Sequence, residues 1–93
     1  MHEKVEENVP RKRFELRISD DALAAAYYRL DGARVVLIHT EVPAEFSGQG
    51  IATELAHGTL RLLCETGRTA VPKCPFMSRF VARHREYANL VTG

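Results

Sequence analysis

The sequence predicts an α/β fold with a small mixed sheet, and three stretches indicate this. Residues 12–18 alternate polar and apolar side chains, as in a strand with one buried face. Residues 35–38 are continuously apolar, which is typical of a strand covered on both faces. From residue 51 the apolar residues recur at helical spacing. We therefore expect about four strands, a long helix on one face of the sheet and a short C-terminal helix.

Length and composition limit the classes of protein to consider. The 93 residues suffice for one domain, and 45% of them are apolar. A net charge of +1 gives no basic footprint for nucleic acid. No run approaches the roughly 20 apolar residues of a membrane span. We expect a disordered tail at residues 1–10, one domain over residues 11–93, and neither nucleic acid nor membrane as a partner.

Two cysteines, Cys64 and Cys74, do not make a disulfide framework. The polar N-terminus has neither the apolar core of a signal peptide nor the Arg-rich character of a transit peptide. These features favour a reducing, cytoplasmic setting with free thiols. The histidines and cysteines lack zinc-site spacing, so no metal is expected.

The individual elements follow in chain order. Residues 22–30 are ambiguous, because their alanines favour a helix while the Asp-Gly at 31–32 favours a hairpin, and we predict a strand. A strong strand is expected over residues 33–42 and a helix from Ile51 to about Thr66, stopped by Gly67. Residues 68–71 should form a short strand parallel to the one before the helix.

A second helix should begin at Pro75, because proline is favoured at the first helical position. Cys74 would then occupy the N-cap.

The turn between residues 41 and 52 organises the chain. Gly48 and Gly50 stand where a strand runs into a helix N-terminus, a backbone arrangement suited to holding an anion. The turn matches neither the P-loop nor the dinucleotide-binding fingerprint. From the two glycines alone, an ordinary strand-to-helix loop is an equally good interpretation.

Val42 followed by Glu45-Phe46-Ser47-Gly48-Gln49-Gly50-Ile51-Ala52 resembles the acyl-CoA-binding motif of the GNAT superfamily of acetyltransferases. Three segments together resemble the small single-domain GNAT proteins of the YjdJ type: residues 39–43, the turn at 46–52, and Cys74-Pro75-Phe76 with His84 and Tyr87. The resemblance spans about residues 11–90. Glu45 departs from it, since the superfamily usually has Gln or Arg there, and His84-Arg85-Glu86-Tyr87 departs from the frequent His-Pro-x-Tyr.

This resemblance implies a minimal GNAT-like fold, with acetyl-CoA or another acyl-CoA as co-substrate and an unidentified amine as acceptor, either a small molecule or a protein lysine or N-terminus. It implies that the strand before the turn pairs with the pantetheine arm and that the turn clasps the diphosphate. The implied binding residues are Thr40, Glu41, Val42, Phe46, Ser47, Gly48, Gln49, Gly50, Ile51, Ala52 and Thr53.

Cys74 is the candidate nucleophile. The thiolate is the reactive form of cysteine, and a helix N-terminus favours it. A relay would then pass the acetyl group from CoA to Cys74 and on to an amine. The alternative is a small buried hydrophobic residue, the commonest role of a free cysteine. Cys64 is expected in the core.

His39 is a candidate general base toward Cys74 or toward an incoming amine, or else a hydrogen-bonded strand residue. Glu41 is either a base for the amine or a solvated charge. His57 is expected to be structural or exposed. His84 and Tyr87 share one helical face, where Tyr87 either packs or protonates the departing CoA thiolate.

Arg79 and Arg83 could reach the 3′-phosphate of CoA, although surface arginines are the simpler interpretation.

The sequence thus predicts an acetyl-CoA-dependent N-acetyltransferase. A non-catalytic acyl-CoA-binding module is the alternative, and an α/β domain whose loop binds nothing is a third. The acceptor, the preferred acyl chain and the oligomeric state stay open.

Overall fold

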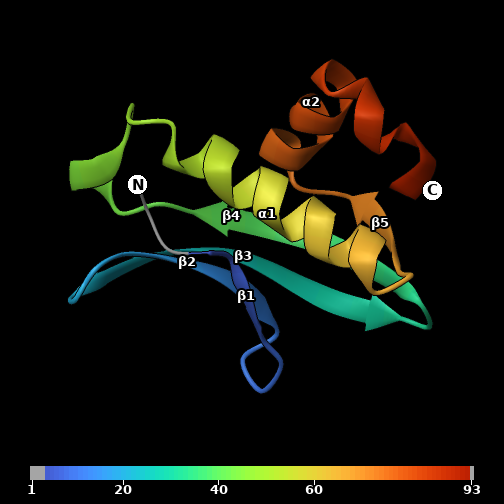
Figure 1. The fold of residues 1–93 in the computed structure, drawn as a ribbon, viewed down its shortest axis with the longest axis horizontal. Coiled ribbons are helices and arrows are strands. Elements are labelled where there is room, and N and C mark those ends of the chain that lie inside the picture. The colour runs from blue at the N-terminus through green and yellow to red at the C-terminus, as the bar shows by residue number, and fades with distance from the viewer. Residues whose placement is uncertain (1–3, 93) are drawn as a thin grey trace.

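A five-stranded mixed sheet carries both α-helices on one of its faces (Figure 1). The computed structural model describes residues 4–92. The strands lie in the order β1-β2-β3-β4-β5, and all pairs are antiparallel except β4–β5. The elements are β1 (Glu6–Asn8), β2 (Arg13–Ser19), β3 (Ala22–Asp31), β4 (Arg34–Glu41), η1 (Ala44–Phe46), α1 (Ile51–Glu65), β5 (Thr69–Pro72), α2 (Pro75–Arg83) and η2 (Arg85–Leu90). The predicted α/β class is confirmed, with one strand more than expected.

The additional strand is β1, which pairs with β2 through residues 6–8. The prediction of a disordered tail is therefore wrong for this segment, while residues 1–3 lie outside the described residues. Val5 is only 6% exposed and packs in the core. Arg68 donates two hydrogen bonds to Glu7, at 2.8 and 3.1 Å, and the Tyr28 hydroxyl donates a third. Contacts with residues 21 and 61 positions away hold the strand, so a local pattern could not predict it.

The hairpin of β3 and β4 confirms the choice of strand over helix for the alanine-rich segment. Gly32 has φ +62° and occupies the tight turn. Ala24 and Ala26 are buried on the helix-covered face of the sheet, where their small side chains let α1 lie close. Alanine here serves packing, and its helix propensity is overridden.

The β4–α1–β5 crossover has the predicted parallel pairing, with Val35 beside Ala70. Gly67, at φ +70°, follows the end of α1, as predicted. Leu55, Leu60 and Leu63 of α1 are fully buried against the sheet. Cys64 is exposed rather than in the core, because the neighbouring Leu63 occupies the buried face of the helix.

A β-bulge in β4 changes which side chains face the helices. The register shifts between Tyr27 and Tyr28, which pair with His39 and Leu37 and leave Ile38 as the extra residue. Ile38 is 45% exposed, so the prediction that residues 35–38 are covered on both faces is wrong at this position. Beyond the bulge, Thr40 points to the helix face and His39 to the other face.

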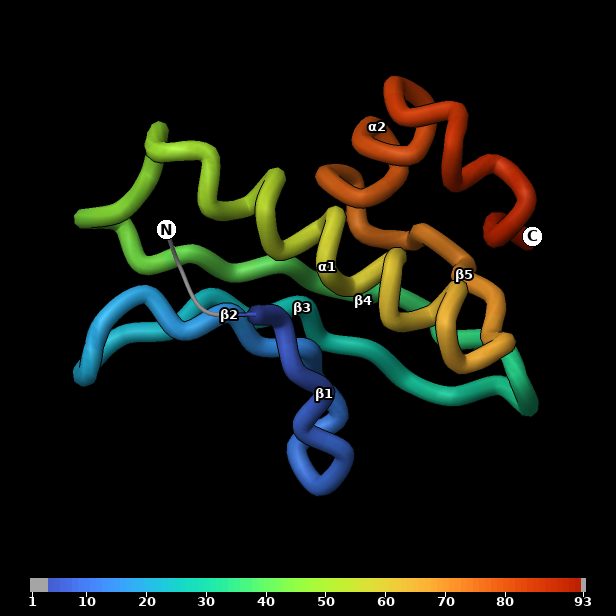
Figure 2. Tube along the Cα trace, viewed as in Figure 1, coloured from blue at the N-terminus to red at the C-terminus, as the bar shows by residue number. Residues whose placement is uncertain are grey.

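The chain passes from β5 directly into α2, which lies beside α1 on the same face (Figure 2). Its N-cap is Cys74 and Pro75 is its first residue, as predicted. No helix within residues 4–92 is long and apolar enough to cross a membrane.

Candidate functional site

The loop between β4 and α1 presents a cluster of free backbone amides. Gly48 and Gly50 have φ of +79° and +77°, a region that other residues adopt only with strain, and Gly50 is the N-cap of α1. Within residues 4–92, the amides from Gly48 to Thr53 have no hydrogen-bond partner. The first intrahelical bond runs from the Glu54 amide to the Gly50 carbonyl, at 3.1 Å. The positive end of the helix dipole adds to these donors, so the loop is suited to an anion such as a diphosphate.

The side of β4 that faces β5 is open beyond Leu37. The parallel pairing ends at Leu37 and Pro72, whereas β4 continues to Glu41. Across the part of the chain that the structure describes, residues 38–41 therefore have no strand partner on the β5 side. We call this segment the open edge of β4. An extended ligand with amide groups could pair with it, because the backbone groups on this side are available.

Cys74 lies at the beginning of the open edge. The amides of Lys73 and Cys74 both donate to the Leu37 carbonyl, at 3.0 and 2.8 Å, and fix the start of α2 against β4. The Sγ of Cys74 lies 3.4 Å from the Oγ1 of Thr40. Cys74 is 4% exposed and stands at the positive end of α2, where negative charge is favoured. The nucleophile candidate and the open edge of β4 are thus in contact.

His39 does not face Cys74. Its ring stacks on Tyr27 with centroids 5.8 Å apart, and its side chain is 60% exposed on the face without helices. Adjacent strand residues point to opposite faces, so Thr40 rather than His39 meets the thiol. A role for His39 as a base toward Cys74 is therefore wrong for this arrangement. We call the face of the sheet without helices the uncovered face. A role of His39 as a base toward an amine that arrives at this face stays a prediction.

Glu41 shares the uncovered face with His39. One of its carboxylate oxygens lies 3.9 Å from the Nε2 of His39, and the other accepts a hydrogen bond from the Tyr27 hydroxyl at 3.5 Å. The Tyr27 oxygen in turn accepts from Arg13 at 3.2 Å. A carboxylate and an imidazole thus stand together at the end of β4, next to the open edge.

His57 and Tyr87 join α1 to η2. The Nδ1 of His57 lies 2.9 Å from the Tyr87 hydroxyl, and its ring packs edge-on against Phe80 and His84. Burial, and secondarily the neighbouring His84, lower the pKa of His57 below its usual value. The prediction of a structural role for His57 agrees with these contacts. Tyr87 packs in the same cluster, and a role for it as a proton donor stays untested.

Of the other predicted residues, Ile51 is buried in the core, and Val42 and Phe46 are partly buried against it. Glu45 is exposed on η1, and Arg79 and Arg83 are exposed on α2. Within residues 4–92 no group of His, Cys, Asp and Glu side chains could hold a metal ion.

Sequence reasoning missed three contacts: Thr40 with Cys74, Tyr27 with His39, and His57 with Tyr87. Each depends on register or on tertiary packing. Asp31-Gly32 gives the hairpin, but no residue pattern marks the bulge that decides which of residues 38–41 face the helices.

Comparison with known proteins identifies the family. Residues 13–90 match the sequence model of the GCN5-related N-acetyl-transferase family. Protein NATD1 of Bos taurus is 35% identical over 80 residues, which cover 84% of this chain and 71% of that protein. Protein NATD1 of Homo sapiens is 34% identical over 80 residues, with the same coverage. An NMR solution structure of a GCN5-like protein from Staphylococcus aureus matches with a TM-score of 0.73 at 22% identity, over 97% of this chain and 88% of that chain.

The solved structure shares the fold, and the family match covers both the glycine loop and Cys74. The predicted resemblance to small GNAT proteins is confirmed. The chain belongs to the GCN5-related N-acetyltransferase family.

Proposed function

We propose that the protein transfers an acetyl group from acetyl-CoA to an amine through an acetyl-cysteine at Cys74. The observation that carries the proposal is the position of Cys74. The thiol lies at the start of the open edge of β4, in contact with Thr40 of the strand that leads into the free amides of the glycine loop. A ligand with a diphosphate at that loop and a pantetheine arm along β4 would bring its thioester toward Cys74.

The first step forms the acetyl-cysteine. The Cys74 thiolate attacks the thioester carbonyl, its Sγ–C bond forms, and the bond between that carbon and the CoA sulfur breaks, so CoA leaves as a thiolate. Cys74 is the N-cap of α2, so its side chain lies at the N-terminal end of that helix when it attacks. The Thr40 hydroxyl, 3.4 Å from Sγ, can donate a hydrogen bond that orients the sulfur.

The second step releases the product. An amine nitrogen attacks the acetyl carbonyl on Cys74, the new N–C bond forms, the C–Sγ bond breaks, and the sulfur leaves as a thiolate. The nitrogen must lose a proton, and His39 and Glu41 are the titratable groups near the open edge that can accept it.

The exposed Cys64 supplies an internal control for this proposal. Intact-mass measurement after incubation with acetyl-CoA should show one added acetyl group in the wild type and in Cys64→Ala, and none in Cys74→Ala. An added amine should remove the group and yield the N-acetyl product. Acetylation that survives Cys74→Ala, or that disappears with Cys64→Ala, would refute the relay.

A non-catalytic acyl-CoA-binding module is the second candidate. The 4% exposure of Cys74 favours it, because a buried thiol is less accessible to a substrate. If calorimetry shows binding of acetyl-CoA and intact mass shows no added acetyl group, the binding module is the function. If acetyl-CoA does not bind, both functions are excluded.

A further inference from the structure

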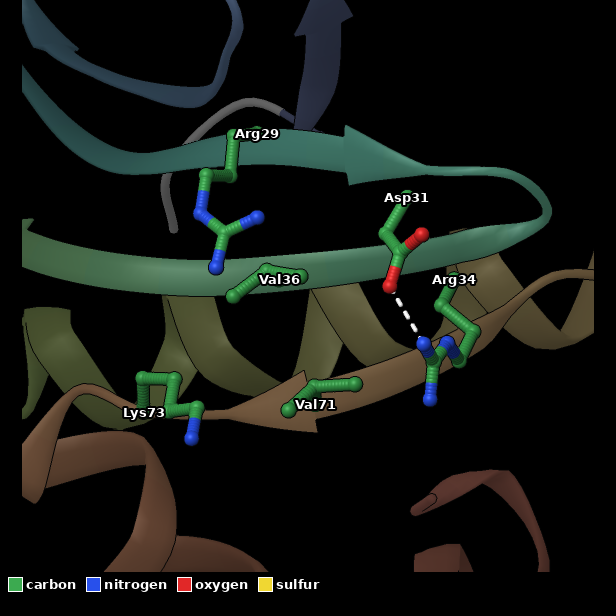
Figure 3. Close-up of a pocket in the computed structure, with 6 residues that line it drawn as sticks. All are labelled: Arg29, Asp31, Arg34, Val36, Val71 and Lys73. Carbon is green, nitrogen blue, oxygen red and sulfur yellow. Dashed lines mark hydrogen bonds and ion pairs between the residues drawn. The ribbon is translucent and has the colours of Figure 1, made fainter. Parts of the chain in front are cut away.

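The uncovered face of the sheet carries a cationic depression of about 250 Å³ next to the open edge of β4 (Figure 3). In this view α1 lies behind the sheet, so the depression is on the face opposite to α1. Val36 and Val71, which are 3% and 7% exposed, form an apolar floor between the charged side chains. The lining residues are Arg29, Asp31, Arg34, Val36, Val71 and Lys73.

Two of the cations that line the depression are unpaired within residues 4–92. Arg34 forms an ion pair with Asp31, which neutralises both charges. Arg29 and Lys73 form no ion pair or hydrogen bond with any side chain within residues 4–92. Two positive charges that have no charged partner within residues 4–92 and that line one depression attract an anion.

The depression leads toward the candidate site. Arg29 pairs with Val36 across the sheet, and Tyr27 pairs with His39. Two residues along β3 correspond to about 7 Å, so the Arg29 position is about that far from the Tyr27–His39 pair on the same face. On the other side, Lys73 immediately precedes Cys74, and both amides bond to the Leu37 carbonyl.

We propose that the amine acceptor carries an anionic group, carboxylate or phosphate, which Arg29 and Lys73 bind while its amine reaches the open edge of β4 beside Cys74. The chain between the two charged ends would cross the depression toward His39 and Glu41, where the ammonium would lie. This inference rests on the proposed acetyl transfer and adds the chemical class of the acceptor. It assigns the uncovered face to the acceptor and the helix face to acyl-CoA.

Matched acceptors test the proposal. Turnover of acetyl-CoA would be measured with 4-aminobutyrate against 4-aminobutyramide, and with O-phosphoethanolamine against ethanolamine. We expect kcat/KM to be about fivefold higher for the anionic member at low salt, which is the size that two solvent-exposed charge pairs allow. The two pairs of compounds distinguish carboxylate from phosphate. Equal kcat/KM values within both pairs would overturn the proposal.

Variants of Arg29 and Lys73 test whether these residues cause the preference for the anionic acceptor. Arg29→Gln and Lys73→Gln should each reduce the ratio of anionic to neutral kcat/KM, and the double variant should bring it close to one. Because the ratio is taken within each variant, any change in acetylation of Cys74 cancels. Arg17→Gln removes an exposed cation from β2 and should leave the ratio unchanged. If the ratio of anionic to neutral kcat/KM stays high in the double variant, or falls equally in Arg17→Gln, then Arg29 and Lys73 do not bind the anionic group.

Binding is also measured without turnover, by an NMR titration of ¹⁵N-labelled protein. We expect 4-aminobutyrate or O-phosphoethanolamine to shift the amide signals of Arg29 and Lys73, and the neutral partners not to. If no acetyl transfer occurs with any amine but these shifts are seen, the proposed function fails while anion recognition stands. Shifts with polyglutamate and with neither small anion would overturn the small-molecule assignment in favour of an acidic protein partner.

Discussion

Gly48 and Gly50 set the direction of the amides at the start of α1. Both have positive φ, and the space around each is open, since an added Cβ would meet nothing within 4 Å. The requirement for glycine is therefore conformational and not steric. A side chain at Gly50 would disfavour the left-handed backbone and turn the free amides away from a shared anion.

Gly50→Ala should weaken acetyl-CoA binding about tenfold in calorimetry, since the strained backbone relaxes by reorienting the anion-binding amides. It should also lower the free energy of unfolding by about 1–2 kcal/mol. Gly67→Ala is the matched control: its φ is +70° and its surroundings are open, but it lies at the other end of α1. It should show a similar loss of stability with an unchanged Kd. Equal affinity of Gly50→Ala and the wild type would exclude the loop as the diphosphate site.

At the level of elements, Val5, the residue that precedes β1, closely approaches α1 at Gly58. A Cβ at this position would lie 2.2 Å from the Cγ2 of Val5 and 2.6 Å from its Cβ, distances at which one of the two segments must move. Glycine usually weakens a helix interior, so its presence here has a packing reason.

Gly58→Ala should destabilise the protein by about 1 kcal/mol, because overpacking against Val5 exceeds the gain in helix propensity. Urea unfolding of Gly58→Ala, Val5→Ala and the double variant measures this. The double variant should lose less free energy of unfolding than the two single variants lose together. Strict additivity, or stabilisation by Gly58→Ala alone, would show that β1 does not constrain this helix position.

Glu7 links β1 to the segment after α1. Hydrogen bonds from Arg68 lower the pKa of the Glu7 carboxyl below 4.5, against the effect of burial. The ion pair is largely shielded, with side-chain exposures of 19% for Glu7 and 23% for Arg68. A carboxyl whose pKa is lowered by folding stabilises the folded state above its unfolded pKa and loses that contribution as the pH falls below about 4.5.

Glu7→Gln should lower the free energy of unfolding at pH 7 by about 1–2 kcal/mol, since the charged partner Arg68 is left without its anion. The loss should shrink as the pH falls from 4.5 through the lowered pKa of Glu7, because the wild-type carboxyl then becomes protonated as well. Glu6→Gln, on the exposed side of the same strand, should change stability little at either pH. A difference between wild type and Glu7→Gln that does not depend on pH would argue against the ion pair.

His57 makes the contact between α1 and η2 depend on pH. Its pKa lies below 6.5 in the folded protein, chiefly because of burial and then because of His84. The unfolded chain therefore binds a proton more readily, and stability falls as the pH drops below 6.5. Denaturant unfolding between pH 7.5 and 5 should show this loss in the wild type and less of it in His57→Gln. His39→Gln, whose side chain is 60% exposed, should keep the full pH dependence. If His57→Gln keeps the pH dependence of stability and His39→Gln loses it, then His39 on the sheet surface, and not His57, causes this dependence.

Local sequence patterns were sufficient to predict most helices and strands and the glycine loop between β4 and α1. Asp31-Gly32 specified the hairpin, apolar spacing specified α1, and Pro75 specified the start of α2. The predictions that were wrong concern features that depend on contacts between residues far apart in the sequence. β1 is held by Arg68, 61 residues away, and the outward position of Cys64 depends on which face of α1 meets the sheet. The bulge at Ile38 is fixed by pairing with β3, and it reverses which neighbour meets Cys74.

At the scale of the whole molecule, the sheet separates two surfaces that meet at the open edge of β4. One face carries α1 and α2 (Figure 1), together with the glycine-loop amides that have no partner within residues 4–92. The other face carries Arg29 and Lys73 (Figure 3), together with His39 and Glu41. Early termination of β5 at Pro72 creates the opening, and Cys74 stands beside it. In this account, acyl-CoA approaches from one face and the acceptor from the other.

The kinetic competence of acetyl-Cys74 decides whether the relay operates. Protein acetylated by acetyl-CoA would be separated from CoA and mixed rapidly with 4-aminobutyrate, and loss of the acetyl group would be followed by quenched intact mass. We predict that the acetyl group leaves Cys74 at least as fast as steady-state turnover under the same conditions, with one N-acetyl product per group lost. Loss slower than turnover, or undiminished turnover in Cys74→Ala, would contradict the relay.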